Sequence, residues 1–302
     1  MKSIIKNINY WLTYGTCHSL RILTWLPYRW QMLLGNALGK FAYLFATKAR
    51  HIATTNIQLC FPNLNKAMQK SLVQECFGSL GMGAFESLLA AFGDQRKFKS
   101  LNINIKGLDA VEEAIHSGIG AIILFPHFVP MYLIGRLTRD ISKLPISLMY
   151  HAPKNKALND FFLFNLERYC PTVFNRKHAN RMIKYLRQGN IVWYAPDLDI
   201  GKKHSLFVPF FNHPAATLTA TLRIAALSQA KVFPIQFYRQ DKLTGYDINI
   251  LPALNNFPSD DPYQDLTQIN QLIEEFIKLK PEQYLWIYKR FSSRPEGQTK
   301  FY

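Results

Sequence analysis

The residue best suited to acid–base chemistry in this sequence is His127, which lies just beyond an unbroken apolar run, 121–125. A β-rich run this short predicts a strand that is buried on both faces, as in a parallel sheet. Pro126 ends the run, and Pro130 suits the first turn of a helix, where its missing N–H costs nothing. We therefore expect the imidazole at the carboxyl end of a central strand, where open α/β sheets bind ligands. The alternative is a histidine that is simply satisfied by backbone groups at a strand end.

Strands and helices are expected to alternate along most of the chain. Apolar or alternating runs predict further strands at 101–106, 145–150, 191–195, 231–238, 246–251 and 283–291. Helical periodicity predicts helices at 64–93, 109–116, 131–140, 180–186, 215–230 and 263–279. Gly78, Gly81 and Gly83 either weaken the first of these helices or mark close helix packing. The alternation predicts an α/β fold with a mixed, mainly parallel central sheet flanked by helices.

The charge distribution indicates an anionic membrane surface as a partner. The 302 residues carry a formal net charge of +16 at pH 7, and no Asp or Glu occurs before Glu75. The positive excess is thus concentrated on an apolar, aromatic leading segment, which favours a membrane over nucleic acid. No nucleic-acid-binding motif is present, so we expect no nucleic-acid partner.

Residues 9–27 of the leading segment are apolar but are interrupted by His18 and Arg21. They either span a membrane with Arg21 snorkelling, or lie in the interface with Trp and Tyr at headgroup depth. A pair of core helices is the remaining alternative. No small-residue cleavage site follows the run, so we treat the segment as mature protein.

The cysteines offer no metal or disulfide chemistry. Cys17, Cys60, Cys76 and Cys170 form no Cys-x-x-Cys pair and no zinc-like spacing with histidines. We expect buried thiols in a reducing compartment and no metal site.

Five blocks of sequence carry a resemblance to a known family. They are Asn-Ile-Gln-Leu-Cys-Phe-Pro at 56–62, Ile-Val-Trp-Tyr-Ala-Pro-Asp-Leu-Asp-Ile-Gly at 191–201, Phe-Val-Pro-Phe-Phe at 207–211, Pro-Glu-Gln-Tyr-Leu-Trp-Ile at 281–287 and Arg-Phe-Ser-Ser-Arg-Pro-Glu-Gly at 290–297. Through them nearly the whole chain resembles the late acyltransferases of lipid A assembly. These are bacterial inner-membrane enzymes of the wider glycerolipid acyltransferase superfamily.

The resemblance implies a reaction, a donor and a location. A fatty acyl chain would pass from acyl carrier protein to a hydroxyacyl chain of a lipid A precursor, in lipopolysaccharide biosynthesis at the cytoplasmic face of the bacterial inner membrane. The carrier protein is acidic as a class, so a basic surface would speed the encounter. No metal or bound cofactor is expected. Residues 1–50 would be an N-terminal membrane-anchoring or interfacial segment, and 51–302 the acyltransferase domain.

His127 would be the general base that takes the proton of the acceptor hydroxyl. In the superfamily signature, four residues separate this histidine from an Asp or Glu, but that position here is Tyr132, a phenol that is neutral at pH 7. Three alternatives follow. Another acid, such as Asp197, Asp199 or Glu86, supplies the negative charge beside His127, or Tyr132 orients His127 in a slower enzyme. In the third alternative the protein has lost catalysis and retains lipid binding. An acyltransferase acting on a different lipid acceptor also stays open.

The remaining candidate residues follow from the same resemblance. Arg168 joins His127 and Tyr132 as a candidate catalytic residue. Polar groups suited to phosphates and sugar carboxylates are candidates for substrate binding; they are Arg176, Asp197, Asp199, Gly201, Lys202 and Lys203. The two acids could instead hold a turn, and each cation could be a solvated surface charge. Residues 207–211 either line an acyl groove or belong to the core.

Overall fold

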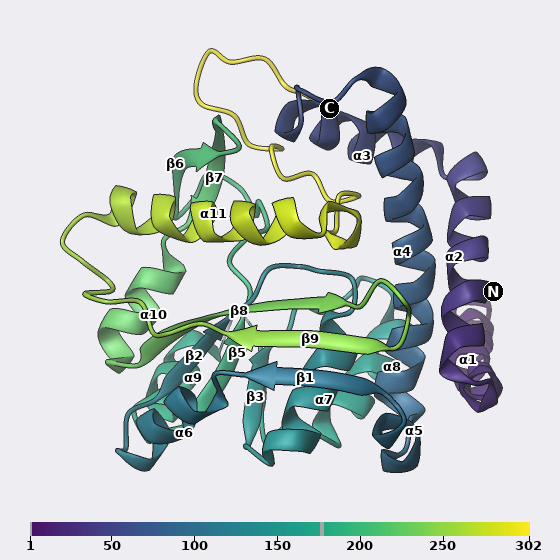
Figure 1. Ribbon diagram of the computed structural model, residues 1–302, viewed down its shortest axis with the longest axis horizontal. Helices are drawn as coiled ribbons and strands as arrows, with labels where there is room; N and C mark the ends of the chain where they lie inside the picture. The colour runs from purple at the N-terminus through teal and green to yellow at the C-terminus, as the bar shows by residue number, and fades with distance from the viewer. Residues whose placement is uncertain (1, 176–177) are drawn as a thin grey trace.

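A seven-stranded sheet lies at the centre of the chain, and the computed structural model describes residues 2–175 and 178–302. Its strands are β1 (Asn102–Lys106), β2 (Ala121–Leu124), β3 (Ile146–Met149), β4 (Val173–Phe174), β5 (Ile191–Tyr194), β8 (Lys231–Arg239) and β9 (Gly245–Ile250). The strand order is β1-β9-β8-β2-β5-β3-β4. β8 and β9 run antiparallel and the other neighbours run parallel, so the predicted mixed, mainly parallel sheet is confirmed (Figure 1).

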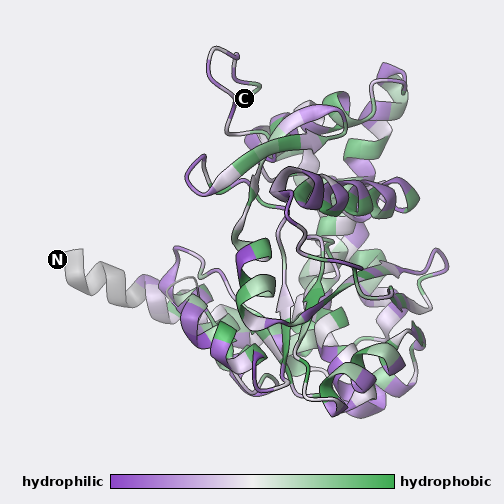
Figure 2. Cartoon of the chain, turned by 90° about the vertical axis from the view of Figure 1, so that its left-hand side faces the viewer, coloured by the Kyte–Doolittle hydropathy of each residue, from purple (hydrophilic) through white to green (hydrophobic). Residues whose placement is uncertain are grey.

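The two strands at the middle of the sheet are buried throughout. Every residue of β2 and of β5 is buried, as expected for parallel strands that are covered on both faces. Figure 2 shows hydrophobic residues gathered in the central strands. The register pairs Leu124 of β2 with Tyr194 of β5, so both strands end at the same edge of the sheet.

Helices flank the sheet and make up most of the chain before β1, whereas the residues after Gln283 form a loop (Figure 1). The helices are α1 (Lys2–Ser19), η1 (Leu20–Trp25), α2 (Tyr28–Phe45), α3 (Thr47–Cys60), α4 (Lys66–Phe92), α5 (Gln95–Lys99), α6 (Leu108–His116), α7 (Met131–Ser142), α8 (Lys156–Glu167), α9 (Ala179–Leu186), α10 (Ala220–Ser228), α11 (Pro262–Leu279) and η3 (Pro281–Gln283). Capping residues mark the N-termini of two of the longest helices. Asn65 caps α4 by accepting from the backbone N–H of Met68, and Asp261 caps α11 directly before Pro262.

Two sequence-based predictions of secondary structure were wrong. The predicted helix at 215–230 begins only at Ala220, because the residues before it form a hairpin of β6 (Ser205–Phe210) with β7 (His213–Leu218). In the block 207–211, for which an acyl groove and the core were both open, Phe210 and Phe211 are buried in the core. The predicted strand at 283–291 is absent, because Pro281 starts a short 3-10 turn and only one bridge, Phe128 with Tyr284, follows it.

Glycines let α2 and α4 pack at very short range. A Cβ added to Gly81 would lie 1.9 Å from the carbonyl oxygen of Gly35, and one added to Gly39 would lie 2.0 Å from that of Phe77. Any larger residue at these positions would collide with backbone, which cannot rotate away as a side chain can. In the predicted 64–93 helix, Gly81 and Gly78 therefore mark close packing of α4 against α2 (Figure 1), whereas Gly83 leaves room for the Val129 side chain.

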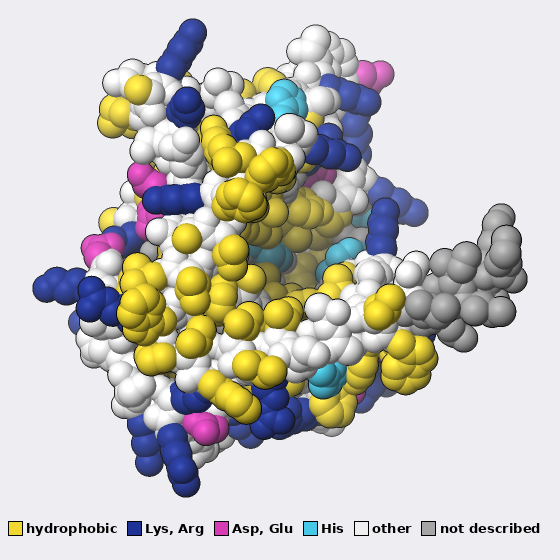
Figure 3. Space-filling view, turned by 90° about the vertical axis from the view of Figure 1, so that its right-hand side faces the viewer, with side chains coloured by type: hydrophobic (Ala, Val, Ile, Leu, Met, Phe, Trp, Pro, Cys, Tyr) yellow, Lys and Arg dark blue, Asp and Glu magenta, His cyan; other side chains and the backbone are white. Residues whose placement is uncertain are grey.

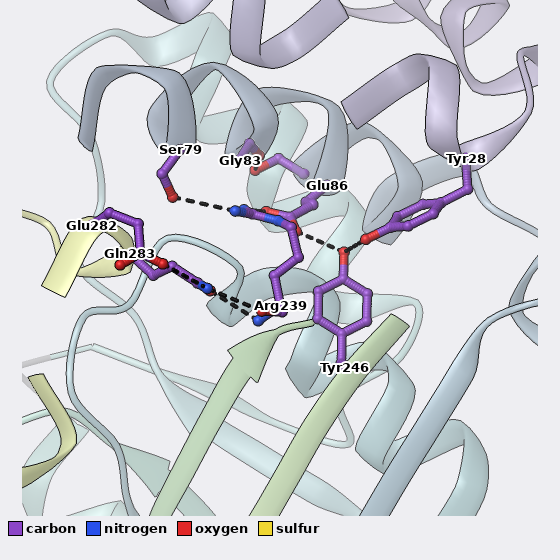
Figure 4. A network of polar contacts seen from close by, with 9 residues as sticks. Tyr28, Ser79, Gly83, Glu86, Arg239, Tyr246, Glu282 and Gln283 are labelled. Atoms are coloured by element: carbon purple, nitrogen blue, oxygen red, sulfur yellow. Dashed lines mark hydrogen bonds and ion pairs between the residues drawn. The ribbon is translucent and has the colours of Figure 1, made fainter. Parts of the chain in front are cut away.

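A buried ion pair ties α4 to the sheet (Figure 4). Arg239 of β8 donates from Nε and Nη2 to the two carboxylate oxygens of Glu86 on α4, at 2.8 and 2.7 Å. Tyr246 of β9 donates to the same carboxylate at 2.6 Å, and Tyr28 of α2 donates to the Tyr246 hydroxyl at 2.9 Å. Because both charges are buried and Glu86 has several donors, the network fixes α2 and α4 against the sheet.

The outward face of the N-terminal helices is apolar. None of the described helices is both long and apolar enough to cross a membrane. Large hydrophobic side chains are nevertheless exposed along α1, η1 and α2, and Figure 3 shows hydrophobic side chains over this side of the molecule. The exposed residues include Trp11, Leu12, Ile22, Trp25, Trp30, Leu33, Leu34, Leu38, Phe41, Leu44 and Phe45. Membrane association of residues 1–50 stays a prediction.

The contact of α2 with α4 can be tested by adding one methyl group. Gly81→Ala should lower the free energy of unfolding by about 1–3 kcal/mol, because the new Cβ collides with the Gly35 backbone. Denaturant unfolding measures the change. Gly15→Ala on α1 is the matched control, since its Cβ would meet nothing within 4 Å. Equal stability of the two variants would contradict the close contact.

Candidate active site

The structure brings His127 and Asp197 together at the carboxyl edge of the sheet. β2 and β5 are parallel neighbours, and each residue lies at the same offset beyond the paired positions Leu124 and Tyr194. The backbone N–H of Phe125 continues the ladder by donating to the Tyr194 carbonyl at 3.1 Å. The imidazole and the carboxylate therefore lie next to each other, because each follows the end of one of two adjacent parallel strands.

The His127 ring is held by the carboxylate of Asp197. Nδ1 of His127 lies 2.6 Å from Oδ1 of Asp197. Because an ionised carboxylate only accepts hydrogen bonds, Nδ1 carries the proton and Nε2 of a neutral ring presents its lone pair. The Asp197 side chain is fully buried, whereas 16% of the His127 side chain is exposed. The ring can therefore meet a substrate on one side while the acid behind it is shielded from water.

Two further hydrogen bonds complete the surroundings of Asp197. Oδ2 accepts from the backbone N–H of His127 at 2.9 Å and from the hydroxyl of Tyr284 at 2.9 Å. Burial would raise the pKa of Asp197, but the electrostatic interaction with the His127 imidazole and the hydrogen bonds from His127 and Tyr284 outweigh it, so the pKa is lowered. Burial and the Asp197 charge raise the pKa of Tyr284, which therefore stays a neutral donor. The carboxylate is ionised at neutral pH.

A short segment after η3 holds Tyr284 in place. The carbonyl of Gln283 accepts from the Val129 N–H at 2.8 Å, and the Leu285 N–H donates to the His127 carbonyl at 3.0 Å. The Gln283 side chain also accepts from the backbone N–H of Arg239 and donates to the Arg239 carbonyl, at 2.8 and 3.0 Å (Figure 4). The His127 loop is thus tied to β8, whose Arg239 side chain binds Glu86.

Tyr132 lies in the first turn of α7 and faces another aromatic side chain. Its ring stacks on Phe162 with centroids 5.4 Å apart, and burial raises the pKa of its hydroxyl, so it is neutral. Among the described residues, no hydrogen bond joins this hydroxyl to His127. The acid in contact with His127 is Asp197, the first of the alternatives that the sequence offered.

Glu86 and Asp199, the other two acids considered, are engaged elsewhere. Glu86 is paired with Arg239, so it does not serve His127. The Asp199 carboxylate accepts from the backbone N–H and hydroxyl of Ser293, at 2.5 and 2.9 Å, and from the Gly201 N–H at 2.9 Å. Asp199 is buried, and its bonds fasten the C-terminal segment to the loop after β5. Gly201 has a φ of +111°, a conformation that favours glycine.

Among the described residues, none of the basic candidates forms a hydrogen bond or ion pair with His127. Arg168 is exposed at the end of α8, with its guanidinium 5.2 Å from the ring centre of Tyr169. Lys202 and Lys203 are exposed in the loop before β6. Arg176 lies outside the described residues. Roles of these four in catalysis or substrate binding stay predictions.

The surface on the side of α1 and α2 is hollowed. Figure 3 shows a hollow lined by hydrophobic side chains with histidine side chains inside it. An apolar hollow is suited to an acyl chain. Within the described part of the chain, no group of three or more His, Cys, Asp or Glu side chains could hold a metal ion.

Sequence reasoning missed Tyr284. It lies in the 281–287 block, among apolar neighbours that gave no sign of which side chain faces the site. A buried tyrosine needs a hydrogen-bond partner for its hydroxyl, which is the one signal that could have raised the question.

Known proteins similar to this chain share one description. The family model described as bacterial lipid A biosynthesis acyltransferase matches residues 2–293. A lipid A biosynthesis lauroyltransferase of Escherichia coli K12 is 32% identical over 295 residues, covering 97% of this chain and 95% of the relative. A palmitoleoyltransferase of the same strain is 31% identical over 294 residues, with the same coverage. A myristoyltransferase of that strain is 27% identical over 266 residues, or 88% of this chain and 82% of the relative.

The Tyr284 hydrogen bond predicts a pH-dependent loss of stability. The folded pKa of Asp197 is lowered, so the ionised carboxylate contributes stability above its unfolded pKa of about 3.9, and this contribution is lost as pH falls through the folded pKa. Tyr284→Phe removes one bond to that charge and should cost about 1.5–3 kcal/mol of unfolding free energy at pH 7. The difference from wild type should shrink as the pH falls below the unfolded value.

Tyr238→Phe provides the control for this measurement. Its hydroxyl donates to the Phe276 carbonyl at 2.9 Å, so the variant loses a bond of the same kind without touching a carboxylate. Denaturant unfolding across this pH range should give a constant difference for Tyr238→Phe. A constant difference for Tyr284→Phe as well would mean that the tyrosine does not act on Asp197.

Proposed function

Since the chain belongs to the family of bacterial lipid A biosynthesis acyltransferases, we propose that it moves a fatty acyl chain from acyl carrier protein to a hydroxyacyl chain of a lipid A precursor, with His127 as general base. Acyl transfer follows from the family itself. The observation that carries the mechanism is the contact between His127 Nδ1 and the buried carboxylate of Asp197.

The reaction needs a hydroxyl to be deprotonated as it attacks a thioester. Nε2 of His127 takes the proton from the acceptor hydroxyl while its oxygen bonds to the thioester carbonyl carbon. The carbon–sulfur bond then breaks, the ester remains, and the imidazolium returns the proton to the leaving thiolate. The nucleophile belongs to the substrate and the donor carries its own activated acyl group, so this route requires no metal or bound cofactor.

The carboxylate of Asp197 supplies the negative charge that the neutral phenol of Tyr132 lacks. A carboxylate on Nδ1 fixes the ring tautomer and stabilises the imidazolium that forms during attack, as in a Ser-His-Asp triad. Its burial strengthens that interaction, because water does not screen it. The intact pair favours catalysis over the alternative of a lipid-binding relative without activity. Tyr132 then has no charge to provide, and its place in the signature is filled by an acid from a neighbouring strand.

The acyl donor and the location of the protein are proposed from the charge and the apolar side chains of its surface. The net charge of +16 would attract an acidic carrier protein. The exposed apolar side chains of α2, in a region with no acid before Glu75, suit insertion into the headgroup region of an anionic bilayer. We place the protein at the cytoplasmic face of the bacterial inner membrane, where the carrier protein and the lipid substrate meet.

Substitution of the pair tests the chemistry. With an acyl carrier protein thioester and a tetra-acylated lipid A precursor, His127→Ala should lower kcat by at least about 10²–10⁴. Asp197→Asn should lower it by up to about 10⁴, because the amide can leave the ring in the wrong tautomer. Product formation is measured with the carrier protein thioester and, separately, with a coenzyme A thioester of the same acyl chain.

His116→Ala is the matched control, because this histidine is exposed at the end of α6. It should retain wild-type turnover. Unchanged turnover in His127→Ala would remove the imidazole from the mechanism, and equal use of both donors would remove the requirement for the carrier protein.

The proposed docking face can be tested with vesicles. Leu38 and Phe41 on α2 are 57% and 60% exposed, and Leu38→Glu/Phe41→Glu should weaken binding to phospholipid vesicles at least about tenfold, because each buries apolar surface there. Leu227→Glu/Leu279→Glu makes the same change at exposed positions on α10 and α11 and should bind normally. Equal binding of both double variants in a flotation assay would exclude α2 as the docking face.

A further inference from the structure

A cavity of about 470 Å³ lies where the end of α2, the length of α3 and the start of α4 meet. Its lining is polar and basic, and includes Arg50 and His51 from α3 and Lys66 and Lys70 from α4. No acidic side chain lines it. Neither His127 nor Asp197 lines it, so the cavity is separate from the His127 site.

The positive charge of the cavity is not neutralised from within the chain. Among the described residues, Arg50, Lys66 and Lys70 form no ion pair. Lys66 also begins α4, a helix of 27 residues whose N-terminus adds a partial positive charge. Cations that share a cavity in this way repel one another, and a bound anion would remove that repulsion.

One of these cations is already fixed in position. Nη1 of Arg50 donates to the carbonyl of Tyr43 at 3.0 Å, and the guanidinium lies 5.1 Å from the Tyr43 ring centre. These contacts use one edge and one face of the guanidinium and leave its remaining N–H groups for a ligand. A planar, pre-oriented guanidinium beside two lysines suits the oxygens of a phosphate group.

The cavity adjoins the apolar face of α2. Tyr43 lines the cavity, while Phe41, Leu44 and Phe45 of the same helix are 57–69% exposed. Figure 3 shows Lys, Arg and His side chains gathered on the upper part of this face, above the hydrophobic ones. Apolar contact directly beside cations matches the two ends of an amphiphile, with acyl chains against α2 and an anionic headgroup in the cavity.

We infer that this α3–α4 cavity binds the phosphate of an anionic membrane lipid. The inference rests on the proposed membrane location and not on the chemistry of His127. A protein partner fits less well, because a stable protein interface takes roughly 800 Å² from each side, whereas a concave cavity of this size holds a single headgroup. A free phosphate ion would use the cations but not the adjoining apolar surface.

The test compares two double variants of the full chain on vesicles. Lys66→Gln/Lys70→Gln should lose about tenfold or more of the affinity for vesicles of phosphatidylcholine with phosphatidylglycerol, and bind pure phosphatidylcholine vesicles as wild type does. Lys184→Gln/Lys231→Gln removes the same charge from exposed positions on α9 and β8 and should keep the phosphatidylglycerol-dependent gain. Equal losses in the two variants would show a diffuse charge effect and overturn the site.

Three further measurements identify the occupant. His127→Ala should keep the phosphatidylglycerol-dependent gain, so failure of the acyl-transfer mechanism would leave this result intact. Inorganic phosphate should compete no better than potassium chloride of equal ionic strength; stronger competition would make free phosphate the ligand and overturn the lipid. Unacylated acyl carrier protein should bind both double variants equally. Loss of carrier-protein binding in Lys66→Gln/Lys70→Gln, with vesicle binding intact, would assign the cavity to the carrier protein and overturn the inference.

Discussion

The hydrogen bond between His127 and Asp197 is the interaction on which the rest of the site depends. A fully buried carboxylate is costly to ionise unless donors surround it. Here the donors are the imidazole, the backbone N–H of the same histidine and the hydroxyl of Tyr284. Each is fixed by backbone that is itself hydrogen-bonded. The same burial that makes the charge expensive also makes it effective on the ring, because no water weakens the contact.

The hydrogen-bond donors of Asp197 link the His127 loop to the body of the fold. Tyr284 belongs to a segment that hydrogen-bonds to the His127 loop on one side and, through Gln283, to the backbone of Arg239 on the other. The Arg239 side chain completes the buried pair with Glu86. Helix α4, strand β8 and the His127 loop are therefore joined by one continuous polar network. Buried networks of this kind are stable only when nearly every member has a partner.

Much of this arrangement was present in the sequence as pattern. The apolar runs of β2 and β5 predicted buried strands of a mainly parallel sheet, and each is followed at the same interval by a polar residue, His127 or Asp197. Pairing of the two strands then brings those residues together. The sequence left three acids as candidates because their choice depends on tertiary contacts, and only the structure shows Glu86 with Arg239 and Asp199 with Ser293.

Other features depended on contacts that periodicity does not encode. The segment 215–218, Ala-Ala-Thr-Leu, is too short to distinguish a strand from the start of a helix, and its pairing with β6 makes it a strand. The sequence around Tyr284 gave no sign of where its side chain points. The role of Gly81 in α4 was ambiguous until the structure showed the backbone of α2 against it.

The glycines between α2 and α4 have a consequence for geometry on a larger scale. With backbone against backbone, α2 has no side-chain layer along which it could slide or tilt relative to α4. Its outward face is therefore held in a fixed position relative to the rest of the fold, which carries His127. With α2 resting on a membrane and His127 as the base, as proposed, a lipid alcohol would reach Nε2 only if its own scaffold spanned that fixed distance, so selection among acceptors would include a measurement of length.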